Sequence, residues 1–452
     1  MSTVTSLAVA SHFIAAHWRW RVLHGARLHR FQEERAQKIV AFAAGHSPFY
    51  RRHWRDHDQR AWRSLPTVDK RAMMERFDTF NTAGVTQDAA MAVALAAETT
   101  RDFTSTVHGL TVGLSSGTSG HRGLFLVSPQ EQAQWAGVIL ARAIHSLPKG
   151  PLRVAFFLRS FSNLYAQAGR WLLQLRYFDL MTPLEEAVPA LNDYQPHLIV
   201  APPSLLGFLA KAQQRGALHI APQRLISVAE VLEPQDAAHL AGFFQAPVHQ
   251  IYQCTEGLLA VSCAHGSLHI QEDIVAVQLE PLASGDPASH QDNQHQGAFY
   301  TPILTDLWRR TQPIIRYRLN DVLRLDPQPC RCGSQFRVIA AIEGRCDDVC
   351  YFPTTSGNRR PVFPDALRRM VLLSSPSIID YQIVQCQDGH LRIHLDTAPG
   401  VAFGPIAASV TEQVQRILGG YDCLPARLEI ERGLLLQAAG TKRRRVRRED
   451  GC

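Results

Sequence analysis

The chain of 452 residues has no apolar run of 18 residues, and its first ten residues include no basic side chain. The first absence argues against a membrane-spanning helix, and the second against a secretory signal peptide. Its nine cysteines are an odd number and lack the spacing of a disulfide framework, which favours a reducing compartment. We therefore expect a cytoplasmic protein without a membrane span.

Charge is also scarce and unevenly distributed. Charged residues make up 19% of the chain and hydrophobic residues 46%, which indicates a folded globular protein. The formal net charge is +7, and residues 441–452 supply +4 of it through six basic and two acidic residues. Because the positive charge is concentrated in this tail, we expect no nucleic-acid-binding surface on the main body. The tail by itself is typical of a solvated charged end.

Glycines and hydroxyl residues are concentrated between Leu114 and Gly123. The loop lacks the Gly-Lys-Ser/Thr ending of the Walker motif and does not fit Gly-x-Gly-x-x-Gly. Glycines let successive backbone N–H groups converge on an anion, and hydroxyls donate to phosphate oxygens. The candidate phosphate-binding residues are Ser115, Ser116, Gly117, Thr118, Ser119 and Gly120. Taken alone, the segment fits a phosphate loop and an ordinary surface turn about equally well.

The apolar pattern predicts the fold class. Residues 17–50 show helical spacing that ends at Ser47-Pro48, and Ser128-Pro-Gln-Glu131 is a capping box after a strand at 124–127. Strands at 153–158, 197–201, 224–228 and 248–252 then alternate with helical segments. This alternation predicts an α/β domain with a mainly parallel sheet flanked by helices. The chain becomes β-rich after residue 260, and its last hundred residues predict a small α+β unit.

Four further motifs follow the loop in a fixed order. They are Tyr252-Gln-Cys-Thr-Glu-Gly257, Arg316-Tyr-Arg-Leu-Asn-Asp321, Glu343-Gly-Arg-Cys-Asp-Asp348 and Gly440-Thr-Lys-Arg443. With the loop, they resemble the ordered motifs of the adenylate-forming superfamily of acyl-CoA synthetases, peptide-synthetase adenylation domains and luciferases. The N-terminal segments 47–50, 65–70 and 77–81 resemble its phenylacetate–coenzyme A ligase-like branch, which also holds adenylyltransferases of a deazaflavin cofactor. The resemblance covers nearly the whole chain.

The resemblance implies an architecture and an activity. A large N-terminal domain, residues 1–343, would bind ATP and the acid, and a small mobile domain, residues 344–452, would rotate about a hinge at 344–348. The implied reaction is ATP-dependent activation of a carboxylic acid to an acyl-adenylate, with release of pyrophosphate. Thioester formation on coenzyme A or on the phosphopantetheine of an acyl carrier protein would follow. The aromatic segments 156–161 and 163–165 favour an aromatic acid, unless they are simply core.

The resemblance also assigns roles to single residues. Thr255 would contact the α-phosphate, Glu256 would hold Mg²⁺, Tyr252 would pack on adenine, and Asp321 would accept the ribose hydroxyls. Without the resemblance, Glu256 would be interpreted as a capping acid at a helix N-terminus and Asp321 as a turn residue that bonds its own backbone. A carboxylate beside phosphates needs a hard cation between them, which supports the Mg²⁺ assignment.

The basic residues depart in part from the family pattern. Lys442 would be the catalytic cation, but Gly440-Thr-Lys442 replaces the usual Gly-Lys, so Arg443 or Arg444 could take its place. His121-Arg122 stands where the superfamily commonly has Pro-Lys, although an arginine fork can still bind phosphate. At the expected hinge, Arg345 would contribute to the nucleotide site and exchange partners with Asp347 as the small domain rotates.

Cysteine spacing suggests a metal. Cys330-Arg-Cys332-Gly and Cys263-x₅-His269 would together give a Cys₃His set, which is typical of structural zinc. Members of the branch carry a similar Cys-x-Cys turn, and some bind zinc there. Buried free thiols with a surface histidine are the alternative interpretation.

Two other functions remain open from the sequence. An adenylyltransferase would stop at an AMP ester of a cofactor and would need no thiol. A non-catalytic, zinc-stabilised protein would use the basic tail to bind an acidic partner.

Overall fold

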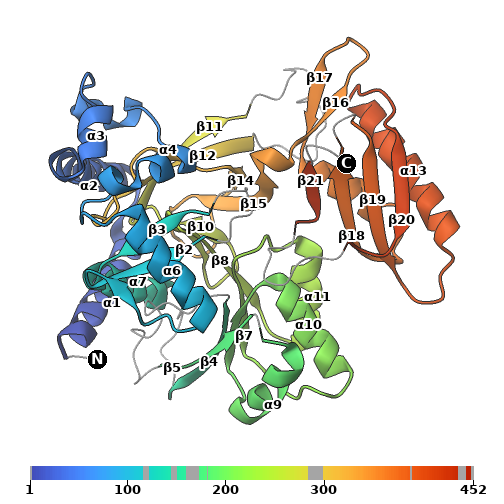
Figure 1. The fold of residues 1–452 in the computed structure, drawn as a ribbon. Helices are drawn as coiled ribbons and strands as arrows, with labels where there is room; N and C mark the ends of the chain where they lie inside the picture. Colours follow the sequence, from blue (N-terminus) through green and yellow to red (C-terminus); the bar gives the residue numbers. More distant parts are fainter. Residues whose placement is uncertain are drawn as a thin grey trace. The chain divides into compact units, whose positions relative to one another are not determined.

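The computed structural model describes residues 3–115, 122–143, 150–158, 173–180, 182–282, 299–386, 389–435 and 444–448, except the side chains of residues 3–5, 365 and 369. Figure 1 shows the ribbon. The chain divides into two compact units. Unit 1 consists of Met1–Gln278, Ile303–Leu319 and Asp326–Ala340, and unit 2 of Leu279–Pro302, Asn320–Leu325 and Ala341–Cys452. The predicted boundary after residue 343 stays a prediction.

Unit 1 begins with helices. They are α1 (Thr3–Val22), α2 (Gly25–His46), α3 (Pro48–His53), the 3₁₀ helix η1 (Gln59–Ser64), α4 (Lys70–Glu75), α5 (Phe77–Phe80) and α6 (Gln87–Thr100). The prediction of one helix over residues 17–50 is wrong, because extended backbone at His24 separates α1 from α2. The predicted end at Ser47-Pro48 is confirmed. There the hydroxyl of Ser47 accepts a hydrogen bond of 3.3 Å from the Tyr50 N–H and caps α3.

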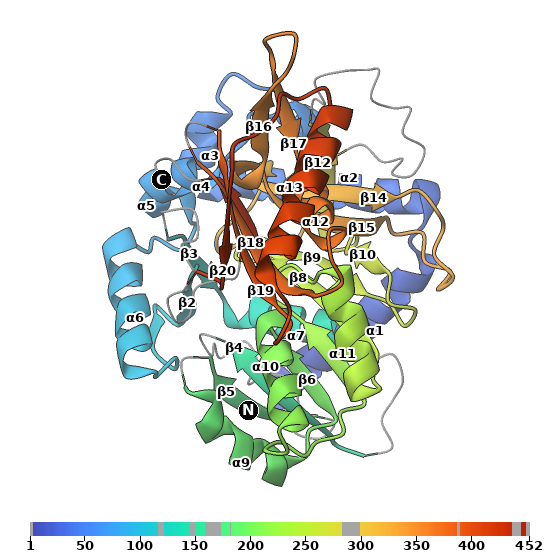
Figure 2. The ribbon, with the colours of Figure 1, turned by 90° about the vertical axis from the view of Figure 1, so that its right-hand side faces the viewer.

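A small antiparallel sheet follows α6. It contains β1 (Thr106–Val107), β2 (Leu110–Leu114) and β3 (Leu124–Val127). The strand expected at 124–127 is present, but it pairs with β2 and not with the parallel sheet. In Figure 1 and Figure 2, α6 lies along β2 and β3, and apolar residues of α6 and of the sheet form one core with Phe77. The two strands bracket residues 115–123 in the sequence, so this sheet positions both ends of the glycine-rich loop.

The parallel sheet of unit 1 has the strand order β8-β7-β6-β4-β5. Its strands are β4 (Leu152–Leu158), β5 (Leu173–Asp179), β6 (Leu198–Ala201), β7 (Arg224–Ser227) and β8 (Val248–Cys254). Its helices are α7 (Pro129–Ala143), α9 (Leu184–Tyr194), α10 (Pro203–Gln214) and α11 (Pro234–Phe244). Side chains alternate between two cores, so that Ala155 and Phe157 pack with α9, α10 and α11, while Val154 and Phe156 face Leu140 of α7. The predicted parallel sheet between helices is confirmed.

Beyond β8 the pairing becomes antiparallel. The strands β9 (Gly257–Ser262) and β10 (Leu268–Ile270) follow, and β10 pairs with β15 (Val338–Arg345). In unit 1, the second half of β12 (Phe299–Asp306) pairs with β13 (Tyr317–Arg318). The boundaries between the units fall within β11 (Val275–Pro281), β12, β14 (Asp321–Asp326) and β15, and between β13 and β14. The predicted change to β-rich structure after residue 260 is therefore confirmed.

Unit 2 has a four-stranded sheet with the order β20-β19-β18-β21. Its strands are β18 (Ile378–Gln385), β19 (Leu391–Thr397), β20 (Leu428–Arg432) and β21 (Val446–Arg448). Two helices, α12 (Pro364–Leu372) and α13 (Phe403–Gly420), pack on it through one buried core. A 3₁₀ turn η3 (Cys346–Asp348) and the hairpin β16 (Cys350–Pro353) and β17 (Arg359–Val362) precede them. The α+β unit predicted for the last hundred residues is confirmed.

Among the described helices, none combines the length and apolarity that a membrane crossing requires.

Candidate functional site

The tight turn after β8 carries the predicted Thr255 and Glu256. β8 and β9 pair up to Cys254 and Gly257, so these two residues alone connect the strands. Because the strand β9 and not a helix follows Glu256, this residue is not a helix cap. The turn lies at the carboxyl end of a parallel strand, where open α/β sheets bind their ligands.

The Glu256 side chain is buried and oriented. Its Oε1 accepts a hydrogen bond of 2.9 Å from the hydroxyl of Tyr317 in β13. Burial, together with the negative charge of Glu256, raises the pKa of Tyr317, so this hydroxyl keeps its proton and remains a donor. Tyr317 was not among the predicted site residues, although it lies inside the motif Arg316–Asp321.

Other contacts fix the backbone of the same turn. The buried Arg309 donates a hydrogen bond of 2.7 Å from Nη1 to the carbonyl oxygen of Thr255. A shift in strand register lies between Tyr252 and Gln253, and the amide of Gln253 accepts a hydrogen bond of 3.2 Å from the indole N–H of Trp135. Tyr252 itself is half-buried near the end of β8. The predicted residues Tyr252, Thr255 and Glu256 thus lie together at the carboxyl end of β8.

The glycine-rich loop is described at its two ends. Ser115 and Gly123 close its base, because the Ser115 N–H donates to the Gly123 carbonyl at 2.8 Å and the Gly123 N–H donates to the Ser115 hydroxyl at 2.7 Å. The predicted Ser116, Gly117, Thr118, Ser119 and Gly120 lie outside the described residues.

Arg122 does not have the surroundings expected of a phosphate ligand. Its Nη1 and Nη2 donate to the two carboxylate oxygens of Glu98 in α6, the former at 2.8 Å. Its Nε donates to the carbonyl oxygen of Ser115 at 3.1 Å. The guanidinium therefore attaches the base of the loop to α6.

Three further predicted residues, Asp321, Arg345 and Asp347, belong to unit 2. Asp321 begins β14 and is half-buried, and Arg345 ends β15. The side chain of Asp347 in η3 accepts a hydrogen bond from the Asn320 amide. Gly344 has φ of +118°, a conformation that side-chain-bearing residues rarely adopt.

The candidates for the catalytic cation are placed differently. Lys442 and its alternative Arg443 lie outside the described residues. Arg444, the other alternative, forms an ion pair with the buried carboxylate of Asp348, and burial lowers its pKa.

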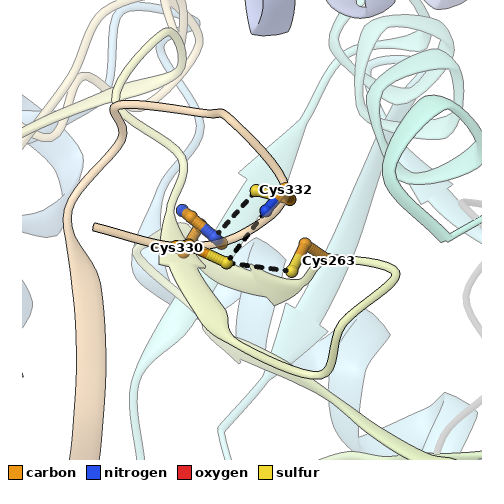
Figure 3. A group of neighbouring side chains, drawn as sticks. Cys263, Cys330 and Cys332 are labelled. Atoms are coloured by element: carbon orange, nitrogen blue, oxygen red, sulfur yellow. Dashed lines mark hydrogen bonds between the residues drawn. The ribbon is translucent and has the colours of Figure 1, made fainter. Parts of the chain in front are cut away.

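The structure brings the four predicted metal ligands of unit 1 together. Cys263, His269, Cys330 and Cys332 each offer one ligand atom, and these atoms all lie within 4.8 Å of one another. Figure 3 shows the three thiols converging, Cys263 from the end of β9 and the other two from a single turn. Residues 67 positions apart thus meet, as the two spacing motifs predicted.

The distances fit a tetrahedral zinc site. With Zn–S bonds of about 2.3 Å and Zn–N bonds of about 2.05 Å, a tetrahedron requires S···S near 3.8 Å and S···N near 3.5 Å. The Sγ atoms of Cys263 and Cys330 are 3.7 Å apart, and Cys332 Sγ lies 3.4 Å from His269 Nε2. Two of the ligand–ligand distances therefore match those of a tetrahedral zinc site, and the others are no longer than 4.8 Å.

The surroundings of the cluster also suit a metal. Nδ1 of the fully buried His269 lies 2.8 Å from the carbonyl oxygen of Phe336, so an Nδ1–H donor there leaves Nε2 as the electron-pair donor facing Cys332. The Cys332 N–H donates to Cys330 Sγ at 3.5 Å, and the Ser334 N–H donates to Cys332 Sγ at 3.4 Å. Such bonds stabilise thiolates.

The thiols are unequal in their acidity. Burial raises the pKa of Cys332 to about 12. Burial also opposes ionisation of Cys330, but hydrogen bonds from the Cys332 backbone and from Ser267 and His269 outweigh it and lower the pKa of Cys330 to about 6. A divalent cation would stabilise all three as thiolates.

Comparisons with known proteins agree with this architecture. The chain is 24% identical over 390 residues to the phenylacetate–coenzyme A ligase of Thermus thermophilus, an alignment that covers 81% of this chain and 80% of the relative. A crystal structure of 2-hydroxyisobutyryl-CoA ligase in the postadenylation state, with 2-HIB-AMP, matches with a TM-score of 0.69 at 18% identity. The match covers 96% of this chain and 91% of that one. The chain has the fold of an adenylate-forming ligase.

A second structure of that ligase, with R3-HIB-AMP, gives a TM-score of 0.70 at 17% identity over the same shares of both chains. No family model matches the chain. The similarity to a phenylacetate–coenzyme A ligase agrees with the resemblance predicted from the motifs, and the solved structures show that the fold is shared.

Proposed function

We propose that this protein is an ATP-dependent acid–CoA ligase that proceeds through an acyl-adenylate. A carboxylate oxygen of the acid attacks the α-phosphorus of ATP, the bond to the bridging oxygen breaks, and pyrophosphate leaves. The thiol of coenzyme A then attacks the acyl carbon, and AMP leaves. The observation that carries the proposal is the fold similarity over 96% of the chain to a CoA ligase whose crystal structure holds an acyl-AMP.

The described residues of unit 1 suit the first half of this reaction. Thr255 lies in the turn at the carboxyl end of β8, with its carbonyl oxygen bonded to Arg309, and we assign it to the α-phosphate. Glu256 offers a buried, oriented carboxylate, and Mg²⁺ prefers oxygen ligands of this kind. When bound, Mg²⁺ would neutralise phosphate charge. The hydrogen bond from Tyr317 fixes the orientation of the Glu256 carboxylate, so that Mg²⁺ would bind a ligand that is already oriented.

The other roles follow from the same assignment. We propose that Asp321 accepts the ribose hydroxyls, that Tyr252 packs on adenine, and that Lys442 stabilises the charge that develops between the carboxylate and the α-phosphate. Because Arg444 is paired with Asp348, we retain Lys442 as the catalytic cation. Losing a preorganised donor of this kind lowers the rate by about 10²–10³-fold.

The Cys₃His cluster would hold a structural zinc. All four ligands are protein atoms, which is the composition of closed structural sites and leaves no position for a substrate. The ion would fasten the turn at residues 330–334 to the hairpin of β9 and β10, and β9 is the strand that follows the Thr255–Glu256 turn. We assign it to stability and not to the reaction.

The acid that the protein activates has to be identified by a substrate screen, and the structure and the comparisons suggest which acids to test first. Phe156 and Phe157, two of the residues on which the prediction of an aromatic acid was based, are buried in cores on opposite faces of the parallel sheet. The segment 163–165 lies outside the described residues. Aryl acids remain the first candidates because of the similarity to a phenylacetate–coenzyme A ligase, and short hydroxy acids follow because of the similarity to a 2-hydroxyisobutyryl-CoA ligase.

Pyrophosphate exchange across aryl, hydroxy and fatty acids tests the proposal. We expect acid-dependent exchange, followed by AMP release only when coenzyme A or a phosphopantetheinylated carrier protein is added. Lys442→Ala should abolish exchange while ATP binding persists. Transfer of AMP to a hydroxyl acceptor without any thiol would favour the adenylyltransferase, and a protein that exchanges with no acid would favour the non-catalytic alternative.

A further inference from the structure

Lys70 lies at the base of the glycine-rich loop, although it precedes that loop by 45 residues. Its ammonium donates a hydrogen bond of 3.2 Å to the hydroxyl of Ser115. The same hydroxyl accepts the hydrogen bond from the Gly123 N–H that closes the loop. A half-buried cation is therefore placed where the two ends of the predicted phosphate loop meet.

Backbone pairing explains why Lys70 reaches this position. The buried Val68 forms a parallel bridge to Tyr317, with its N–H donating to the Arg316 carbonyl at 3.0 Å and its carbonyl accepting from the Arg318 N–H at 2.8 Å. Tyr317 is the residue whose hydroxyl orients Glu256. The segment that carries Lys70 is thus fixed to the same strand that supports the proposed Mg²⁺ ligand.

The side chain of Lys70 also has a specific packing partner. A Cβ added at Gly123 would lie 3.0 Å from Cε of Lys70 and 3.5 Å from the Ser115 hydroxyl. The alkyl chain of the lysine therefore passes directly over the Gly123 backbone. An alanine at position 123 would therefore require the lysine stem to shift by a few tenths of an ångström.

Arg122, the other cation at the loop, is already neutralised. Both of its Nη atoms bond the carboxylate of Glu98, and its Nε bonds the Ser115 carbonyl. Three of the five N–H groups of the guanidinium are used in these bonds, and a phosphate would have to share its charge with Glu98. Arg122 is therefore an anchor of the loop, and a second cation is needed opposite a polyphosphate.

We propose that Lys70 binds the β- and γ-phosphates of ATP and the pyrophosphate that leaves, and that it supplies the positive charge that Arg122 does not. The inference rests on the proposed function and assigns one contact within it. An ammonium is a compact charge on a flexible stem, which suits an anion that must be held and then released. Thr255 and Asp321 are assigned to the α-phosphate and the ribose, so AMP should not depend on Lys70.

Equilibrium binding of ATP, pyrophosphate and AMP to the full-length protein tests this assignment. Lys70→Met keeps the alkyl stem and removes the charge. It should weaken ATP and pyrophosphate by about 10- to 100-fold, the value of a hydrogen bond to a charged group. AMP binding should change much less. Lys70→Arg should restore most of the ATP affinity. The ATP affinity of Gly123→Ala should lie between that of Lys70→Met and that of the wild type.

The neighbouring Arg71 provides the matched control. Its side chain is 82% exposed and pairs with Glu75 on the same helix, so Arg71→Met should leave all three affinities unchanged. Unchanged ATP affinity in Lys70→Met, or an equal loss for AMP and ATP, would overturn the inference. A wild-type protein that binds neither ATP nor AMP would instead refute the proposed function, which is a distinguishable result.

Discussion

The hydroxyl of Tyr317 donates a hydrogen bond of 2.9 Å to Oε1 of Glu256, and both side chains are buried. The two residues come from different segments, β13 and the turn after β8. Because β13 is itself fixed by Val68, the orientation of one carboxylate depends on three separate segments of unit 1.

We expect Tyr317→Phe to impair Mg²⁺-dependent chemistry more than nucleotide binding. Without the hydroxyl, the carboxylate of Glu256 loses an oriented partner, which costs about 1.5–3 kcal/mol for a hydrogen bond to a charged group. The half-saturating Mg²⁺ concentration for pyrophosphate exchange should rise, and the exchange rate should fall about tenfold or more. Tyr381→Phe, which removes a buried phenol hydroxyl from unit 2, is the control. Equal Mg²⁺ dependence in Tyr317→Phe and wild type would contradict the assignment of Glu256.

The Cys₃His cluster predicts about one zinc per chain, the content of a closed four-ligand site. Elemental analysis of the purified protein should find it, and Cys330→Ser should lose both the zinc and several degrees of thermal stability. Cys423→Ser changes a buried cysteine of unit 2 and should retain the metal. Wild-type protein free of zinc, or Cys330→Ser with the full zinc content, would show that the cluster is only a group of neighbouring thiols.

Local features of the chain were predictable because their physical causes lie within a few residues. The capping box at 128–131 is confirmed, since the Ser128 N–H donates to Glu131 Oε2 at 2.8 Å and the Glu131 N–H donates to the Ser128 hydroxyl at 3.3 Å. The alternation of strands and helices likewise identified the parallel sheet. The metal ligands could be proposed from their side-chain chemistry and spacing alone.

Long-range pairings could not be predicted in this way. The sequence offered Arg122 as a phosphate ligand, but no local pattern indicates that Glu98, 24 residues away, holds its guanidinium. Lys70 and Tyr317 gain their positions from a bridge between segments about 250 residues apart. The break between α1 and α2 at His24 is a local feature that was missed, because the residues on which the helical spacing was based, Phe31 to Phe42, all lie in α2.

Glu131 predicts a pH dependence of stability. Beyond the capping box, its Oε1 accepts the backbone N–H groups of Arg310 at 2.7 Å and Thr311 at 2.9 Å. Burial opposes the charge, but these hydrogen bonds outweigh it and lower the pKa of Glu131 below its usual value. A carboxylate with a lower pKa in the folded state stabilises the fold above its unfolded pKa, and this contribution is lost as the pH falls through the folded pKa.

Glu131→Gln should therefore lower the urea midpoint at pH 7, with a cost of about 1–3 kcal/mol for the weakened acceptor. The difference from wild type should shrink as the pH falls below about 4.3, the ordinary value for a glutamate. Glu185→Gln, at an exposed acid in the first turn of α9, should show little difference at any pH. A Glu131→Gln deficit that stays constant from pH 7 to pH 3 would refute the linkage.

Gly344 is the position at which the proposed hinge can be tested separately from the site. An added Cβ would meet Pro364 Cγ at 3.5 Å and Asp348 Oδ2 at 3.8 Å, which are ordinary contacts. The cost of Gly344→Ala is therefore backbone strain at φ of +118°, about 1–3 kcal/mol. If rotation of the small domain precedes thioester formation, a strained hinge should slow CoA-dependent AMP release more than pyrophosphate exchange.

Gly357→Ala is the matched control for that experiment. Gly357 lies between β16 and β17 in the same unit, has φ of +83°, and has open space where a Cβ would be added. Gly357→Ala should lower the stability of unit 2 to a similar extent, but it should leave the ratio of CoA-dependent AMP release to pyrophosphate exchange unchanged. If the ratio of thioester formation to pyrophosphate exchange falls in Gly344→Ala but not in Gly357→Ala, the effect is assigned to the hinge. Equal ratios in the two variants would show that Gly344 has only a structural role in its turn.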